Sequence, residues 1–295
     1  MRKEILLCTV IFTQNLPYLK EFFKSVFKQE TSLFDFLVIN EDIDMTQYSQ
    51  WSKNAIVLQE AGSILENRIQ MIEYAKNKGY KYILWQDSDD VCSSGRISAL
   101  KNEIGNFDAI IHDMRIIDKK GKLVCNSFMG NKGNNKIISF TDVQYKNFIG
   151  FGNTMVRVDC LNSNMYIDES IKAVDWWIAC YLTLKGKSLK YIDNKLSDYR
   201  QYDSNLANLK ITSIEQLKQQ LTIVNAHYSG LINLVSENKD LENELIHHKY
   251  KIMLLSKRLS DENIQSDLSN LFDKNSASNY VWWEEVNKII REVKL

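Results

Sequence analysis

The sequence lacks the cysteine pairs and the excess charge that mark several classes of protein. Its five cysteines are widely spaced, and none belongs to a C-x-x-C pair of the kind that holds zinc or performs redox chemistry. We therefore expect reduced, mostly buried thiols in a cytoplasmic protein. The 37 basic and 37 acidic residues cancel, so no global field recruits nucleic acid and no nucleic-acid partner is expected.

Long apolar runs are also missing, because no stretch approaches the roughly 20 apolar residues of a membrane span. Arg2 and Lys3, followed by the apolar run 5–12, resemble the opening of a secretory signal. However, Glu4 interrupts the basic start, and the run is short and lacks a small-residue cleavage site. We expect this run to be a buried parallel strand, in a protein that is soluble or peripheral at the inner face of the membrane.

Short apolar runs alternate with helical patterns near the start of this chain, which is 44% hydrophobic and rich enough in apolar residues for a substantial core. One predicted helix begins at Pro17 with Asn15 as its cap, and another begins with a capping box formed by Ser63 and Glu66. This alternation predicts a mostly parallel sheet whose strands end in polar residues along one common edge. The predicted strands are 5–12, 34–40, 55–58 and 82–85.

The predicted strand 82–85 runs into the acidic segment Asp87-Ser88-Asp89-Asp90. Hard cations such as Mg²⁺ and Mn²⁺ prefer oxygen ligands and keep part of their shell for water or phosphate. Carboxylates at the C-terminal end of a strand, where α/β sheets place their ligands, suit such a cation. Taken alone, the segment is more often a solvated turn or the cap of the next helix.

Beyond residue 90 the predicted sheet becomes mixed, because two strands, 108–117 and 123–128, flank a turn that contains glycine. Residues 130–135 are rich in glycine, asparagine and lysine, which suits either a substrate lid or a plain surface connection. The later predicted elements are a helix at 176–182, a strand at 189–192 and a largely helical region from Ile211 onward.

Six features follow one another along residues 5–205. They are the first strand with its aromatic helix, Glu41-Asp42, Arg68, Asp87-Ser88-Asp89-Asp90, Asp168-Glu169-Ser170 with Val174-Asp175-Trp176, and Tyr199-Arg200-Gln201. Their order resembles the family 2 glycosyltransferases, which are nucleotide-sugar-dependent enzymes with the GT-A fold. The chain departs from the family pattern at Asn40, where an acid is common, and at Tyr202, where a histidine is frequent.

The resemblance implies an α/β catalytic domain of GT-A type over residues 1–205, with a mixed, mostly parallel sheet flanked by helices, and a helical C-terminal region over 206–295. It implies inverting transfer of a sugar from a nucleotide diphosphate sugar, expected to be a UDP-sugar, to a saccharide or other hydroxyl acceptor. Synthesis of cell-surface polysaccharide or glycoconjugate is the expected context. Asp87 and Asp89 would hold Mg²⁺ or Mn²⁺. The residues implied at the donor are Thr9, Glu41, Asp42, Arg68, Asp87, Ser88 and Arg200.

The family position of the catalytic base falls on Asp175. A sugar hydroxyl is a poor nucleophile, so a carboxylate must take its proton as it attacks. The alternative is that Asp175 only caps the helix that follows it. Trp176, its neighbour, is the candidate for contact with the acceptor through an apolar ring face, although large aromatics more often lie in a core.

Arg68 and Arg200 also have two interpretations, because each either contacts phosphate or pairs with a nearby glutamate.

Two other functions stay open. A sugar nucleotidyltransferase also uses paired carboxylates and a metal, but it should carry a Gly- and basic-rich phosphate loop near the N-terminus. Residues 8–15 contain neither glycine nor a basic residue. The second alternative is a non-catalytic protein that binds a nucleotide sugar or a glycan, from which an enzyme would differ by turnover. The sugar, the linkage and the oligomeric state are left open.

The stretch 247–258 combines four basic residues with apolar ones. This pattern leaves open a peripheral contact with an anionic membrane that carries a lipid-linked acceptor. The alternative is a helix packed on the catalytic domain. His247 and His248 point about 100° apart on a helix, so they do not form a ready metal pair and are expected at the surface.

Overall fold

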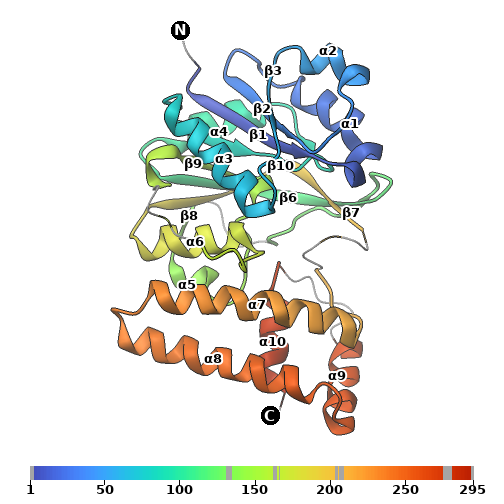
Figure 1. Ribbon diagram of the computed structural model, residues 1–295, viewed down its shortest axis with the longest axis vertical. Helices are drawn as coiled ribbons and strands as arrows, with labels where there is room; N and C mark the ends of the chain where they lie inside the picture. The colour runs from blue at the N-terminus through green and yellow to red at the C-terminus, as the bar shows by residue number, and fades with distance from the viewer. Residues whose placement is uncertain are drawn as a thin grey trace. The chain divides into compact units, whose positions relative to one another are not determined.

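The computed structural model describes residues 3–130, 135–161, 165, 167–202, 205, 209–274 and 281–293 (Figure 1). The chain divides into two units. The first, called the sheet unit here, comprises Met1–Ile138, Ile149–Tyr166 and Gly186–Tyr202. The second, called the helical unit, comprises Ser139–Phe148, Ile167–Lys185 and Asp203–Leu295. Along the chain, the last change from one unit to the other falls between Tyr202 and Asp203, and the helical unit also includes two earlier segments.

The sheet unit contains one mixed sheet with the strand order β3-β2-β1-β4-β9-β6-β10-β5. Its first half is parallel, because β1 (Ile5–Ile11) pairs with both β2 (Phe34–Asn40) and β4 (Tyr82–Trp85), and β2 pairs with β3 (Ala55–Gln59). All four strands predicted in this region are confirmed. Figure 1 shows these strands side by side.

The second half of the sheet contains the antiparallel pairs. β9 (Thr154–Arg157) is antiparallel to β4 and to β6 (Ala109–Asp118), whereas β10 (Leu189–Gln201) is parallel to β6. The predicted mixed sheet of an α/β fold is therefore confirmed, with its parallel pairs concentrated near the N-terminus. The short strands are β5 (Val91–Cys92) on β10, β7 (Leu123–Cys125) on β6 and β8 (Lys136–Ile138) on β10.

Helices α1 (Leu16–Val26), α2 (Ser49–Ser52), α3 (Ile64–Asn77) and α4 (Arg96–Ile104) complete the sheet unit, with 3₁₀ turns at Thr13–Asn15, Thr46–Tyr48, Phe151–Asn153 and Val158–Cys160. The apolar face of α1 is buried and packs aromatic rings on β2, with Phe23 and Phe36 edge to face. The predicted capping box of α3 is confirmed by bonds from the Ser63 N–H to Glu66 Oε2 and from the Glu66 N–H to Ser63 Oγ. Asn15, by contrast, makes no side-chain cap on α1, because its amide points to another partner described below.

The helical unit is built from α5 (Phe140–Val143), α6 (Val174–Leu184), α7 (Ile214–Leu234), α8 (Lys239–Arg258), α9 (Glu262–Lys274) and α10 (Glu284–Glu292). The helices predicted at 176–182 and from Ile211 onward are therefore confirmed. Ser213 and Asn238 cap α7 and α8 by accepting backbone N–H groups of the first turn. In the part of the chain that the structure describes, no helix is both long and apolar enough to cross a bilayer.

The core of the helical unit is aromatic. Trp176 stacks on His227 with ring centroids 3.7 Å apart and lies parallel to Trp283 at 6.0 Å. His248 is also buried and bonds through Nε2 to Asn287 Oδ1 at 2.7 Å, so the predicted surface position is wrong for His248 and correct only for His247. Tertiary packing decides this difference, because the two side chains leave α8 on different faces. The predicted lid or connection at 130–135 falls largely on residues 131–134, which lie outside the described chain.

Candidate functional site

The parallel strands bring their C-terminal ends to one edge of the sheet. Ile11 is in register with Asn40, and the Glu41 N–H bonds to the Ile11 carbonyl at 3.0 Å. On the other side of β1, the Gln86 N–H bonds to the Cys8 carbonyl at 3.0 Å. The polar residues that follow β2 and β4 therefore leave the sheet at the same edge, as the strand pattern predicts.

Asp87 is held at this edge by an arginine from α3. Arg68 is buried, and its Nη2 lies 3.0 Å from Asp87 Oδ1. Its guanidinium also lies over the ring of Phe151 at 4.4 Å, and that ring packs on Trp85 with centroids 4.9 Å apart. Among the described ion pairs, Arg68 therefore binds Asp87 and not a glutamate of its own helix. The aromatic face and the carboxylate together fix the guanidinium group.

Asp89 is tied to the end of β10. Its Oδ2 accepts the hydroxyl hydrogen of Tyr202 at 2.6 Å, and its carbonyl accepts from Nε of Arg200 at 2.7 Å. Burial and the neighbouring Asp87 carboxylate raise the pKa of Asp89 to about 6. The tyrosine that follows the Tyr199-Arg200-Gln201 motif therefore contacts a carboxylate of the acidic loop.

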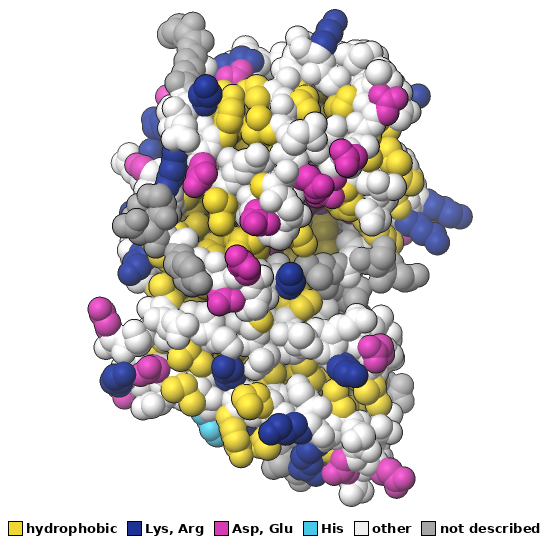
Figure 2. Space-filling view, in the orientation of Figure 1, with side chains coloured by type: hydrophobic (Ala, Val, Ile, Leu, Met, Phe, Trp, Pro, Cys, Tyr) yellow, Lys and Arg dark blue, Asp and Glu magenta, His cyan; other side chains and the backbone are white. Residues whose placement is uncertain are grey.

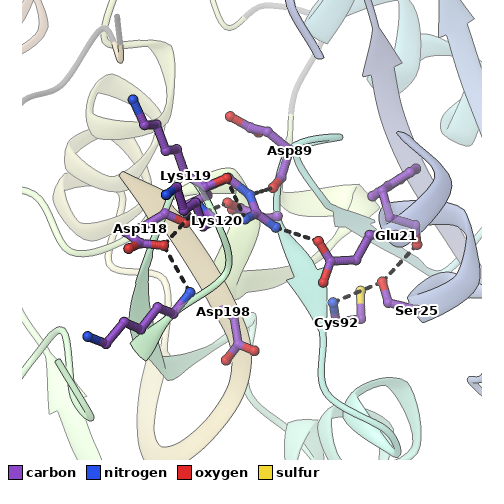
Figure 3. Close-up of polar contacts among 12 residues, drawn as sticks. Glu21, Ser25, Asp89, Cys92, Asp118, Lys119, Lys120 and Asp198 are labelled. Carbon is purple, nitrogen blue, oxygen red and sulfur yellow. Dashed lines mark hydrogen bonds and ion pairs between the residues drawn. The ribbon is translucent and has the colours of Figure 1, made fainter. Parts of the chain in front are cut away.

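Arg200 contacts several segments around this loop. Its Nη2 lies 2.7 Å from Glu21 Oε2, its Nη1 donates to the Asp118 carbonyl at 3.2 Å, and its guanidinium lies over the Tyr18 ring at 4.6 Å. Figure 3 shows Glu21, Asp89 and Asp118 near one another, and Arg200 donates a hydrogen bond to each of them. Because the Arg200 side chain is only 1% exposed, its hydrogen bonds go to the protein, which makes it a support for the acidic loop.

Asp90 is the most buried carboxylate of the loop, at 1% exposed. Its Oδ1 accepts the Arg200 backbone N–H at 2.7 Å, and its Oδ2 has no hydrogen-bond partner among the described residues. Burial, with the nearby Asp89 and Asp87, raises the pKa of Asp90 well above its usual range. Sequence reasoning placed this residue in the acidic motif but gave it no role.

Gly152 faces the two outer carboxylates. A Cβ at this position would lie 3.3 Å from Asp90 Oδ2 and 3.7 Å from Asp87 Oδ2, so the missing side chain leaves space between them. The buried Arg96 holds Gly152 in place, because its Nη2 donates to the carbonyls of Trp85 at 3.1 Å and Gly152 at 2.9 Å. Neither Gly152 nor Arg96 carries a local sequence signal, since both act through contacts that are distant in the chain.

The remaining predicted donor residues lie around this edge in different environments. Ser88 is buried, donates to the Val10 carbonyl at 2.7 Å and accepts from the Asn15 amide at 2.9 Å, which ties the loop to β1 and α1. Thr9 is fully buried within β1. Asn40 closes the loop after β2 by two bonds with the backbone of Ile43.

Glu41 and Asp42 are closer to solvent. Glu41 accepts from the Asn67 amide at 3.3 Å, and burial together with the negative charge of Glu60 raises the pKa of Glu41. Asp42 is exposed and has a φ of 57°, a left-handed conformation that Asp tolerates better than most residues. The structure thus brings Glu41 to the same sheet edge as Asp87, whereas Thr9 supports that edge from within the sheet.

The donor set of the acidic loop consists of oxygen atoms and suits a hard divalent cation. Within the described ranges, no group of three His, Cys, Asp or Glu side chains is arranged to hold a metal ion. Asp87 and Asp89 can supply one or two carboxylates, and the partnerless Oδ2 of Asp90 points to the space beside Gly152. One or two carboxylates fit Mg²⁺ or Mn²⁺ when substrate phosphates and water complete the coordination shell.

Asp175 and Trp176 belong to the helical unit. Asp175 lies in the first turn of α6 rather than at its N-cap, which is Ala173, and its Oδ1 accepts the Trp176 N–H at 2.8 Å. Trp176 is 0% exposed, and its Nε1 donates to the Val143 carbonyl at 2.6 Å. The predicted acceptor contact through its ring is therefore not available in this conformation, because both ring faces pack in the core. Upstream, Asp168 and Glu169 are exposed.

Solved structures with a similar fold identify the fold of this chain. The structure of S. aureus TarS 1–349 in complex with UDP-GlcNAc matches with a TM-score of 0.57 and 16% identity, over 98% of this chain and 90% of that one. The same segment in complex with UDP matches with a TM-score of 0.55 and 14% identity, over the same shares. The chain has a GT-A-like fold. No family model and no curated protein sequence matches it.

Proposed function

We propose that this protein transfers a sugar from a UDP-sugar to a hydroxyl acceptor, with inversion at the anomeric carbon and with Mg²⁺ or Mn²⁺ at the acidic loop. The observation that carries the proposal is the ion pair of Arg68 with Asp87, next to Asp89 with its bond from Tyr202, after the end of a parallel strand. Support also comes from the likeness to TarS, whose structures were solved with UDP-GlcNAc and UDP. The proposed context is synthesis of a surface polysaccharide or glycoconjugate.

The acidic loop would bind the donor diphosphate. A cation shared by Asp87, Asp89 and the phosphates would neutralise the negative charge that develops on the leaving oxygen. Arg68 holds Asp87, and Tyr202 holds Asp89, so both carboxylates are oriented before the donor arrives. Such pre-orientation lowers the cost of binding, because the side chains lose little further freedom.

Asp175 is the proposed base for the acceptor hydroxyl. A carboxylate in reach of that hydroxyl would take its proton during attack on the face opposite the diphosphate, which gives inversion. The Asp175 side chain is partly exposed, and one of its oxygens is used by a backbone N–H. A carboxylate has further lone pairs for a second hydrogen bond, so this bond is compatible with the role.

Thermal denaturation with a panel of nucleotide sugars, with and without Mn²⁺, tests donor and cation together. We expect UDP and one UDP-sugar to raise the melting temperature only with the cation, since ligands that bind the folded state stabilise it. Asp89→Asn should remove this shift. The matched control is Asp35→Asn, at the opposite end of β2, where the carboxylate bonds Tyr80 and Lys3. A cation-independent shift that survives in Asp89→Asn would refute the proposed cation site.

Product analysis separates this function from its alternatives. A glycosyltransferase supplied with its UDP-sugar and an acceptor releases UDP and a glycosylated product. A sugar nucleotidyltransferase would instead release pyrophosphate from UTP and a sugar phosphate. A non-catalytic binding protein would bind the UDP-sugar and release neither product in a broad panel of saccharide and lipid-linked acceptors.

A further inference from the structure

Three lysines gather at the turn between β6 and β7. Lys119, Lys120 and Lys122 are exposed, and none of them has an ion pair among the described residues. Asp118 is the carboxylate among them, and its Oδ1 accepts the backbone N–H groups of Lys120 at 2.8 Å and Lys122 at 2.9 Å. The turn therefore keeps an excess of positive charge in a fixed backbone.

Exposed aliphatic side chains follow the lysines directly. Leu123 is 52% exposed and Val124 is 65% exposed. Adjacent residues of a strand point to opposite faces, so both sides of the hairpin end carry an apolar group beside the lysines. Figure 2 shows dark-blue side chains projecting at the right of the view, at the place of the β6–β7 hairpin in Figure 1. We refer to residues 118–124 as the hairpin tip.

The hairpin tip is fastened to the acidic loop. Arg200 donates to the Asp118 carbonyl at 3.2 Å and to the Asp89 carbonyl at 2.7 Å, so one buried guanidinium joins the two segments. Gly121 lies against the Arg200 guanidinium, since a Cβ at residue 121 would lie 3.7 Å from Arg200 Nη1. The φ of Gly121 is 81°, a backbone conformation that residues with a side chain rarely adopt. The lysines are therefore held at the same sheet edge as Asp89.

We propose that the hairpin tip docks on the surface of an anionic lipid bilayer. The three lysines match the negative headgroup phosphates, and Leu123 and Val124 can enter the interfacial region with little cost because they are already apolar and exposed. Docking would place the acidic loop next to the membrane surface. If the proposed sugar transfer is correct, this position suits an acceptor that is itself carried by a lipid, but the membrane contact does not depend on that activity.

Helix α8 also carries lysines beside exposed apolar side chains, but the link through Arg200 joins the acidic loop to the hairpin tip. Ile246, Tyr250 and Met253 are exposed on it, next to Lys249 and Lys257. It belongs to the helical unit, whereas the acidic loop and the hairpin tip both belong to the sheet unit. The sequence pattern left a membrane contact of this helix open beside packing on the catalytic domain, and the contacts of Arg200 point instead to the hairpin tip. Three lysines of α8, Lys249, Lys251 and Lys257, therefore supply a control with the same change of charge.

Vesicle sedimentation of the full chain tests the proposal. We expect binding to vesicles of phosphatidylglycerol and phosphatidylcholine, no binding to phosphatidylcholine alone, and a loss of binding at high salt because exposed charges are screened. The variant K119Q/K120Q/K122Q should bind about a hundredfold more weakly, at roughly fivefold per lysine. The control K249Q/K251Q/K257Q on α8 should bind like the wild type.

A second pair of variants tests the aliphatic contribution. L123S/V124S should weaken vesicle binding by roughly tenfold or more, because apolar groups contribute to interfacial binding. Val57→Ser, which changes an exposed valine of β3, should not. Glycerol phosphate should displace the protein no more than chloride at equal ionic strength, since a free phosphate offers no apolar phase.

Three results would overturn the proposal. The first is that the α8 variant loses vesicle binding while the hairpin variant keeps it. The second is that free glycerol phosphate displaces the protein from vesicles more than salt of equal ionic strength does. The third is that the hairpin variant changes the oligomeric state in solution and leaves vesicle binding unchanged. UDP-dependent thermal stabilisation should persist in every hairpin variant. If UDP does not stabilise the wild type, that result counts against the proposed donor site and not against the membrane contact. Failure of the proposed function and failure of the membrane proposal are therefore distinguishable.

Discussion

Tyr202 donates its hydroxyl hydrogen to Oδ2 of Asp89 over 2.6 Å and so ties the end of β10 to the acidic loop that follows β4. The neighbouring Arg200 reinforces this tie through its backbone N–H, which bonds to Asp90 Oδ1 at 2.7 Å. These two bonds join segments more than 100 residues apart in the chain. The direction of the Asp89 carboxylate is thus set by β10, and not by the loop alone.

Tyr202→Phe should weaken Mn²⁺-dependent binding of UDP by about tenfold. Groups that hydrogen-bond a metal-ligating carboxylate typically contribute 10–100-fold to metal affinity, and the phenyl ring keeps the contact with Tyr18 while removing the hydroxyl. Titration of UDP at fixed Mn²⁺ would measure the change. Tyr199→Phe, which loses a bond with Gln201 on the same strand, is the control. Unchanged or tighter binding in Tyr202→Phe would show that the hydroxyl does not prepare Asp89 for the cation.

Arg68→Lys should lower UDP affinity by roughly tenfold and leave the fold intact. Lysine keeps the positive charge but loses the planar group that lies on Phe151 and points a nitrogen at Asp87, so the carboxylate is held less firmly. The matched control is Arg157→Lys at the opposite end of the sheet, where the guanidinium bonds carbonyl groups. Calorimetric UDP titration of both variants decides the point, and equal losses would mean that the effect is general.

The sequence predicts the fold of the sheet unit well because its signals are local. The runs in β1 and β4 are continuous and apolar, since strands in the middle of a sheet are covered on both faces, and both are almost fully buried. The capping box at Ser63 and Glu66 is a four-residue signal and forms as predicted. Asn15 is the N-cap residue of α1 as predicted, but its side chain makes no capping bond and its amide donates instead to Ser88, which is distant in the chain.

The candidate site is predictable only in part for the same reason. Acidic residues at a strand end are visible in the sequence, and so are Arg68 and Tyr202 as positions within recognisable motifs. Phe151 and Arg96 carry no such signal, because each acts through tertiary contacts, including one with a residue more than 50 positions away. The sequence also left the burial of Trp176 open, since a tryptophan beside a proposed catalytic residue suits a core as well as contact with a sugar.

Asp175→Asn should keep the fold and the donor affinity while transfer to the acceptor falls by about 10²–10⁴-fold, the usual contribution of a general base. The Asn side-chain oxygen can still accept the Trp176 N–H in the first turn of α6, so little stability should be lost. Asp168→Asn and Glu169→Gln are the controls upstream. If Asp175→Asn stays fully active while one of these loses transfer, the base is that residue and not Asp175.

His227 and His248 provide a matched pair in the helical unit. Burial lowers the pKa of His227 to about 3 and that of His248 to about 4. His248 bonds to Asn287, whereas neither ring nitrogen of His227 has a partner among the described residues. A buried polar atom without a hydrogen bond costs about 1–3 kcal/mol. The two histidines should therefore respond in opposite ways to replacement by phenylalanine.

His227→Phe should raise the free energy of unfolding by about 1 kcal/mol at neutral pH, because phenylalanine keeps the stack on Trp176 and removes two unsatisfied nitrogens. The gain should grow in acid. The unfolded chain binds a proton near pH 6.5 and the folded His227 does not, so stability falls as the pH drops below that value, by about 1.4 kcal/mol per unit for each such histidine. The variant should lose less stability between about pH 6 and pH 4 than the wild type does.

His248→Phe breaks the bond to Asn287 and should destabilise the protein at neutral pH. Urea unfolding at several pH values measures both effects, and a destabilised His227→Phe protein with an unchanged pH slope would mean that His227 has a hydrogen-bond partner in solution.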